Sequence, residues 1–423
     1  MRTLEVRYHG DAGPPRVLGR LAAAREGIYF EYAADAIAAR LDLSPIKLRP
    51  APGVIRGAAE PFAGLHGLFN DSLPDGFGAM LIDRWIQRQG GDPRAASALD
   101  RLAIIGSRAM GALSYHPETG PSSSAVEWNL AAAEAELERV GEGRSSTIIP
   151  ELLLAGGSPQ GARPKLLLLL AENGARAISG SNDIPPGYVP SLVKFAVSKL
   201  SDTESRLEEA YARMARMAGV RMPATRLIDV GKGRVAFAAE RFDRKGAQRI
   251  HMHSAAGLLE VDHRAPSLDY DSLLRLARLL AHSQAEVEAM YRLAVFNVLA
   301  HNRDDHAKNF AFLRDAQGDW SVAPGFDLTF SMGPGGEHTT SVLGRGRDVT
   351  VEILGALGVG ASIPASTCAG IIDQVRAALA TFPRIASELD VPRSTTRQVA
   401  RTLGVAPARK KNGARRRRSG FSG

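Results

Sequence analysis

Short runs of alternating apolar and polar residues occupy the first 40 positions of the chain. Residues 4–10, 17–23 and 27–33 each combine strand-forming apolar side chains with polar ones, and each run contains or adjoins a glycine. A period of two residues is typical of a strand with one buried face, and glycine commonly ends such runs. The pattern predicts a small antiparallel sheet at the start of the chain.

Two segments that follow have the 3.6-residue period of helices. In residues 77–90, Met80, Leu81, Trp85 and Ile86 lie on one face of the expected helix, and Gly90 marks its end. A serine run separates this region from residues 125–141, which we expect to form a helical connector. A subdomain boundary is therefore predicted between residues 120 and 150.

The middle of the chain mixes both periods. Residues 191–197 are predicted to form an apolar strand and residues 201–219 a helix, with Ser201 or Asp202 as its N-cap and Gly219 at its end. Two more strands are expected in 225–231 and 234–244.

A long amphipathic block at 270–302 is predicted to be helical and leads into the polar segment 301–313. Two short strands are expected in 309–315 and 320–328, and the rest to about residue 405 is expected to be mostly helical.

Charge and composition restrict the class of protein. The net charge is +8, but residues 409–423 carry seven basic and no acidic residues, which leaves about +1 for the remaining chain. This tail could attract phosphate polymers or anionic surfaces, or it could be a solvated, disordered end. The single cysteine, Cys368, excludes an intrachain disulfide. Because no apolar run reaches membrane-spanning length and the first residues do not resemble a signal peptide, we expect a cytoplasmic protein.

The strongest chemical pattern lies in the polar segment after the helical block. Asp304 and Asn309 have the D-x-x-x-x-N spacing of a protein-kinase catalytic loop, and Asp327 follows 18 residues later, where kinases hold a second metal ligand. Carboxylate and amide oxygens are the ligands that Mg²⁺ prefers. Two alternatives are a simple polar turn and a metal site; the latter would use the side chains of His301, Asp304, Asp305 and His306.

Two upstream features occur in kinase order. Lys194 stands within an apolar strand, where its charge needs a partner, and the next helix offers Glu208 or Glu209, of which we prefer Glu208. The alternative is an edge-strand lysine whose amine reaches water. Before that strand, residues 156–165 form a glycine-rich segment that ends in Lys165 and could cradle phosphates, or could be a surface turn.

Together these stretches resemble the HipA-type serine/threonine kinases, the toxins of bacterial toxin–antitoxin pairs. The resemblance covers roughly residues 10–385. It is carried by the segments FNDSLPDGFGAMLIDR (69–84), SRAMGALSY (107–115), GGSPQGARPK (156–165), VKF (193–195), ERFDR (240–244), HNRDDHAKNFAFL (301–313) and PGFDLTFS (324–331).

The resemblance implies an ATP- and Mg²⁺-dependent kinase. Asp304 would be the catalytic base, favoured over Asp305 by its spacing to Asn309, and Asn309 and Asp327 would bind Mg²⁺. Ser158 would be a candidate for autophosphorylation, which in the family ejects the loop and switches the enzyme off. The implied nucleotide-binding residues are Ser158, Gly161, Ala162, Lys165, Lys194, Glu240, Phe242, Asp243 and His306.

It also implies a layout and a partner. The fold would be α+β, with a two-lobed protein-kinase-like body, an additional N-terminal β-rich subdomain and a mostly helical C-terminal lobe. The expected parts are the subdomain at 1–125, an ATP-binding lobe at 126–245, a catalytic lobe at 246–405 and a disordered basic tail at 406–423. The partner would be a small helix-turn-helix antitoxin, similar to HipB, that binds operator DNA; the protein substrate stays open. Two rival functions are a non-catalytic, kinase-shaped module that modulates repression and direct DNA binding through residues 409–418.

Overall fold

The computed structural model describes residues 2–405 apart from Ala12, 123–124, Ser145, 157–160, Ala162, Asn173, Ala175, 180–183, 197–198, Lys232 and Ser267. Ser158, Ala162 and the basic tail therefore lie outside the described residues, and the predictions made for them stay predictions.

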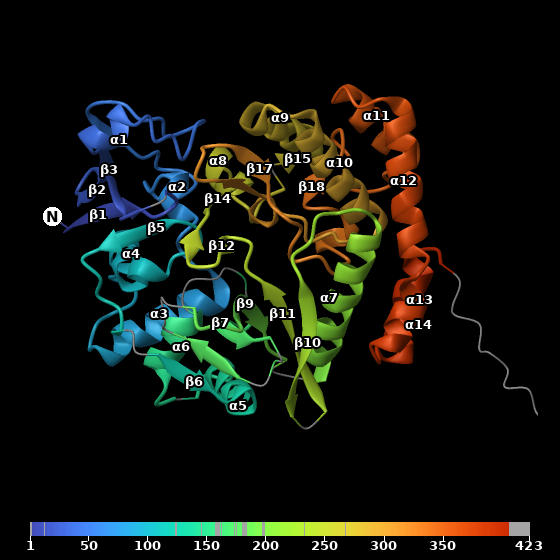
Figure 1. Cartoon of the computed structure of the whole chain (residues 1–423), viewed down its shortest axis with the longest axis horizontal. Helices are drawn as coiled ribbons and strands as arrows, with labels where there is room; N and C mark the ends of the chain where they lie inside the picture. The colour runs from blue at the N-terminus through green and yellow to red at the C-terminus, as the bar shows by residue number, and fades with distance from the viewer. Residues whose placement is uncertain are drawn as a thin grey trace, which may run out of the picture.

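The N-terminal part is built on a five-stranded antiparallel sheet, as its alternating pattern predicts (Figure 1). The strand order is β4-β3-β2-β1-β5, and the strands are β1 (Arg2–Tyr8), β2 (Arg16–Ala24), β3 (Gly27–Tyr32), β4 (Val54–Arg56) and β5 (Leu113–His116). The helices of this part are α1 (Ala34–Ala38), α2 (Gly67–Asn70), α3 (Gly76–Arg88), α4 (Ala98–Ile105) and η1 (Gly106–Arg108). Helix α3 confirms the prediction for 77–90.

A six-stranded sheet follows, in the order β10-β11-β9-β7-β8-β6. Its strands are β6 (Val126–Trp128), β7 (Lys165–Ala171), β8 (Ala177–Ser179), β9 (Tyr188–Lys194), β10 (Thr225–Gly231) and β11 (Arg234–Glu240). The accompanying helices are α5 (Leu130–Gly141), α6 (Ile149–Gly156) and α7 (Lys199–Met217). The strands and the long helix predicted for the middle of the chain are thus confirmed.

The prediction of a continuous helix over 125–141 is wrong at its start. Val126–Trp128 form the edge strand β6, which pairs with β8, and the Trp128 indole donates a 2.7 Å hydrogen bond to the Ser179 hydroxyl. The helix begins only after Asn129, whose side chain accepts from the Ala132 amide. Pairing with a distant strand therefore overrides the local helical period.

The C-terminal lobe is mostly helical. The block predicted at 270–302 forms two helices, because His282 adopts a left-handed conformation with φ of 50° and ends the first. The helices of the lobe are α8 (Ala255–Leu259), α9 (Tyr270–Ala281), α10 (Gln284–Leu299), η2 (Ala307–Asn309), η3 (Pro334–Gly336), α11 (Val351–Gly360), α12 (Ala365–Leu379), α13 (Phe382–Glu388) and α14 (Arg393–Thr402). A short hairpin, β12 (Arg244–Lys245) and β13 (Gln248–Arg249), precedes the lobe. The short strands of the lobe are β14 (His251–Ser254), β15 (Leu268–Asp269), β16 (Ala311–Arg314), β17 (Trp320–Val322) and β18 (Thr340–Ser341).

Two hydrophobic cores hold these parts together. One core runs through both large sheets, from Leu4 to Ala238, so the boundary predicted near residue 125 lies within a shared core. The other fills the C-terminal lobe and includes the inner face of α7, which packs against α12 and α13. Helix α7 thus links the six-stranded sheet to the helical lobe (Figure 1). In the described part of the chain, no helix combines the length and hydropathy needed to cross a membrane.

Candidate active site

Lys194 lies at the centre of the site, at the end of β9. Strand β9 has β7 and β11 as neighbours and the Lys194 side chain is 9% exposed, so the edge-strand interpretation is excluded. Its amine forms ion pairs with the carboxylates of Glu208 on α7 and Asp327. Burial alone would lower the pKa of Lys194, but the two carboxylates raise it above its ordinary value. The charged amine therefore joins the sheet, α7 and the C-terminal lobe, and Glu208 rather than Glu209 is its helix partner.

Asp327 brings a carboxylate to this pair from the loop after β17. Its backbone has a left-handed φ of 53°. Burial alone would raise the pKa of its carboxyl, but the amines of Lys194 and Lys165 hold the pKa well below its usual range. The carboxylate is therefore ionised, which is the state that a metal ligand needs.

Lys165 adds a second cation. It begins β7 directly opposite Lys194 in the β7–β9 pairing, and it is 4% exposed. Burial and the Lys194 charge lower its pKa, and Asp327 opposes this shift. Two lysines side by side on one sheet face create a positive surface that suits phosphate oxygens.

Asp304 and Asn309 come from the loop around η2. The Asn309 side-chain amide nitrogen donates a 2.7 Å hydrogen bond to the backbone carbonyl of Asp304, which leaves the amide oxygen of Asn309 available as a ligand. The Asp304 carboxylate is exposed and has no hydrogen-bond partner among the described residues. Partial desolvation of Asp304 and the nearby carboxylates of Asp327 and Asp305 raise its pKa, against the effect of His306 and Lys194.

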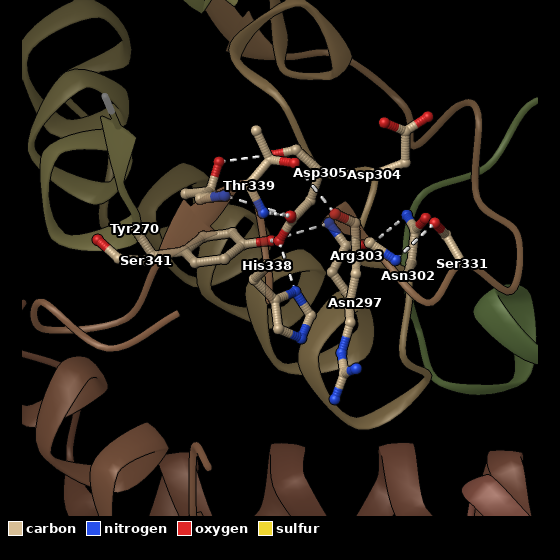
Figure 2. Close-up of polar contacts among 12 residues, drawn as sticks. Tyr270, Asn297, Asn302, Arg303, Asp304, Asp305, Ser331, His338, Thr339 and Ser341 are labelled. Carbon is tan, nitrogen blue, oxygen red and sulfur yellow. Dashed lines mark hydrogen bonds and ion pairs between the residues drawn. The ribbon is translucent and has the colours of Figure 1, made fainter. Parts of the chain in front are cut away.

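The neighbouring Asp305 has a different environment. It is fully buried, and its carboxylate accepts hydrogen bonds from the Tyr270 hydroxyl at 2.7 Å, His338 Nδ1 at 2.9 Å and the Thr339 amide at 2.8 Å. Figure 2 shows Asp305 pointing into this cluster and Asp304 pointing away from it. Asp305 therefore fixes the loop, and of the two carboxylates only that of Asp304 is free to contact a ligand.

One pocket collects most of the predicted residues. Its wall is formed by the six-stranded sheet, the segment after β11 and the loops around η2 and Asp327. The predicted site residues that line it are Gly161, Lys165, Lys194, Glu240, Phe242, Asp243, His306, Asn309 and Asp327. Asp304 is not among the lining residues, although its charge is close enough to affect the Asp327 group.

Asp243 lines the pocket but its carboxylate is already engaged. It is 1% exposed, pairs with Arg241 and Arg244, and accepts a 2.8 Å hydrogen bond from the Gly111 amide. Burial would raise the pKa of Asp243, but the two guanidinium groups hold it well below its usual range. Asp243 therefore joins the segment after β11 to the N-terminal sheet.

Asp75 is a site residue that the sequence patterns do not single out. Its carboxylate pairs with Lys308 at 3.0 Å, accepts from the Gly161 amide and lies 3.6 Å from His263 Nε2. It precedes α3, so the N-terminal part reaches both the glycine-rich segment and the η2 loop. Asp75 lies in the segment 69–84 that carries the family resemblance, but neither this segment nor any local pattern indicates a contact more than 200 residues away.

We expect Asp75→Asn to lower the free energy of unfolding by about 1–2 kcal/mol at neutral pH, because it removes a charged acceptor from Lys308 and Gly161. Lys308 and Gly161 hold the pKa of Asp75 below its ordinary value although burial opposes this. The stabilisation is therefore present at neutral pH and is lost as the pH falls through the folded-state pKa. Urea unfolding at neutral and acidic pH measures this, with the exposed Asp35→Asn as control; an equal loss at both pH values would contradict it.

The alternative metal site at His301, Asp304, Asp305 and His306 does not form. Within the part of the chain that the structure describes, no three His, Cys, Asp or Glu side chains are arranged to hold a metal ion. The reason is local: Asp305 turns into its buried cluster, whereas Asp304 turns to the opposite side (Figure 2).

The sequence matches two family models, and the fold is similar to that of a solved structure. A family model described as the HipA-like C-terminal domain matches residues 157–382, and one described as the HipA N-terminal domain matches residues 11–116. Among solved structures, the chain is similar to one from Shewanella oneidensis MR-1 described as a complex of the toxin–antitoxin system HipA, HipB and its operator DNA. The identity is 17%, the match covers 95% of each chain, and the TM-score is 0.65.

A second solved structure, the Helicobacter pylori proinflammatory kinase CtkA, matches 50% of this chain and 92% of its own at 13% identity and a TM-score of 0.32. The Shewanella match and the family models confirm the predicted fold class, with two lobes and an additional N-terminal β-rich part.

Proposed function

Because the chain belongs to the HipA family, we propose that it is an ATP- and Mg²⁺-dependent serine/threonine protein kinase and the toxin of a toxin–antitoxin pair. The observation that carries the proposal is the buried amine of Lys194, which contacts both Glu208 and Asp327 in a pocket that also contains Lys165 and Asn309. This arrangement supplies cations for phosphates and oxygen ligands for a metal from one cavity.

The residues present fit a nucleotide with Mg²⁺. The protein offers one carboxylate, Asp327, and one amide oxygen, that of Asn309, which is a typical share for a metal that takes its other ligands from phosphates and water. Mg²⁺ bound with ATP would neutralise charge on the transferred phosphoryl group. Lys165 and Lys194 would bind phosphate oxygens, and Glu240 and Phe242 would contact the base.

Asp304 has the properties of the group that receives the proton of the acceptor hydroxyl. Its carboxylate is free and exposed beside the pocket, while its backbone carbonyl is held by Asn309 and its neighbour Asp305 is fixed by the buried cluster. The raised pKa of Asp304 makes it a better proton acceptor than an ordinary aspartate. Positioning by rigid neighbours is what this kind of phosphoryl transfer chiefly requires.

The rate of transfer should fall on acidification at a higher pH than an ordinary aspartate would give. The base must be ionised, and the pKa of Asp304 is raised by partial desolvation and by the carboxylates of Asp327 and Asp305, so protonation begins at a higher pH as the pH decreases. A pH–rate profile at saturating ATP measures this. An acid limb at the pH of an unperturbed aspartate, or its absence, would contradict the assignment.

Phosphorylation of the chain itself is the direct test of the proposal. Incubation with [γ-³²P]ATP and Mg²⁺, alone and with a soluble cell extract, should label serine or threonine, and peptide mapping should place the label of the protein alone on Ser158. A phosphate there would add about two negative charges to the glycine-rich segment and so compete with ATP or repel it. The proposal fails if the wild-type protein transfers no more label than the Asp304→Asn variant.

We further propose a small helix-turn-helix antitoxin as partner, through which the protein acts on DNA. The support is the similarity, over 95% of both chains, to the HipA chain of the Shewanella complex with HipB and operator DNA. The rival function, a non-catalytic module that only modulates repression, predicts no stabilisation by ATP with Mg²⁺. DNA binding by residues 409–418 also stays a proposal, and an unchanged salt dependence after deletion of the tail would refute it.

A further inference from the structure

A second cavity, of about 390 Å³, lies where three parts of the chain meet. Leu167 and Leu169 of β7 and Ile178 of β8 form an apolar floor. Arg108 of η1 contributes from the N-terminal part. The hairpin β12–β13 and the segment before it close the remaining side with arginines; in Figure 1, β12 lies between β5 and the six-stranded sheet.

Three of the lining arginines are partly buried, and their charges are incompletely balanced. Arg249 donates to the carbonyl oxygens of Ser107, Ala109, Gly111 and Leu113 at 2.7–2.9 Å. Carbonyl groups satisfy its N–H groups but carry no net charge. Arg241 and Arg244 share a single carboxylate, that of Asp243.

Several N–H groups of these arginines have no partner. Arg241 uses Nε and Nη2 on Asp243, and Arg244 uses only Nη1, on Asp243 and Gly111. Within the described residues, Nη1 of Arg241 and both Nε and Nη2 of Arg244 make no hydrogen bond. The side chains of Arg241 and Arg244 both line the cavity and keep 11% and 14% of their surface exposed.

The electrostatics of the cavity agree with an excess of positive charge. Four guanidinium groups face two carboxylates, those of Asp243 and of Glu118, which lies 3.7 Å from Arg108. Burial, with repulsion from Arg241, lowers the pKa of Arg249 to about 10. Burial, with repulsion from Arg249, lowers the pKa of His9 to about 4. A bound anion would relieve both repulsions.

We propose that this cavity binds a phosphate monoester with a small apolar body. The phosphate would lie against the free N–H groups of Arg241 and Arg244, because guanidinium forks match phosphate oxygens in geometry and charge. The apolar body would cover Leu167, Leu169 and Ile178. Binding sites commonly combine such an apolar floor with a few convergent polar groups.

The site is separate from the candidate active site. Among the residues that line the two cavities, only Arg241 is common to both, and neither Lys165 nor Lys194 lines the second one. The affinity of a ligand that binds in the second cavity should therefore not change when a lysine is removed from the first cavity.

Titration calorimetry of the full chain with phenyl phosphate tests the proposal. We expect saturable binding of one equivalent in the wild type, in Lys165→Met and in the exposed-arginine control Arg20→Gln, and at least 10-fold weaker binding in Arg244→Gln. Ile178→Trp fills the floor without touching the arginines and should weaken binding to the same extent, so the test does not depend on whether Arg244→Gln folds.

Three outcomes would overturn the proposal. The first is no binding of phenyl phosphate to the wild type at millimolar concentration. The second is binding that Lys165→Met abolishes and that Ile178→Trp leaves intact, which would place the ligand in the active site. The third is equal affinity for inorganic phosphate and phenyl phosphate, unaffected by Ile178→Trp, which would refute the role of the apolar floor.

Discussion

Asp304→Asn should lower the rate of phosphoryl transfer by about 10²–10⁴-fold, the range typical for loss of a positioned general base. The substitution keeps the size of the side chain and removes only its ability to take a proton. Because the pKa of Asp304 is raised in the folded protein, its charge contributes no stability at neutral pH, so the melting temperature should not decrease. Label transfer and thermal unfolding of the same preparation measure both effects, with exposed Asp319→Asn as control. Retained transfer would refute the assignment of the base.

Asp305→Asn, one residue later, should instead lower the stability of the fold. Asp305→Asn replaces a fully buried carboxylate that accepts hydrogen bonds from Tyr270, His338 and the Thr339 amide. An amide cannot accept from all these donors, and its own N–H groups face them, so we expect a loss of about 3 kcal/mol in the free energy of unfolding.

Urea unfolding of Asp305→Asn beside Asp304→Asn and the wild type measures this difference. The two variants have the same amino-acid composition and differ only in which of two neighbouring positions is changed, so each is a control for the other. A free energy of unfolding of Asp305→Asn equal to that of the wild type would show that the buried cluster in Figure 2 does not stabilise the loop.

The chain order of the site could be predicted from the sequence because its parts are tied to local elements. The apolar strand with Lys194 and the amphipathic helix with Glu208 are local patterns, and the spacing from Asp304 to Asn309 is fixed by one loop. The predicted N-cap at Ser201 or Asp202 is wrong, because α7 begins at Lys199 and the Asp202 side chain instead accepts from the Val235 amide. What these patterns could not give is which of two neighbouring aspartates keeps a free carboxylate: Asp304 and Asp305 are chemically identical, and only the contact of Asp305 with Tyr270 and His338 separates them.

Long-range contacts account for what the patterns missed. Asp75 reaches Lys308 across 233 positions, and Asp243 meets the Gly111 amide across 132. Val126–Trp128 read as part of a helix because strand pairing with β8 leaves no trace in a local window. In each case the deciding energy comes from a partner that is distant in sequence, which no periodicity records.

Titration of ATP into the wild-type protein with and without Mg²⁺, repeated for Asp327→Asn and Asn309→Ala, tests the central claim most directly. The account predicts that the wild type binds ATP tightly only when Mg²⁺ is present. Each variant should lose at least 10-fold of this Mg²⁺-dependent affinity. Affinity that is independent of Mg²⁺, or unchanged in both variants, would contradict the claim that Lys194, Asp327 and Asn309 form one site for a nucleotide and its metal.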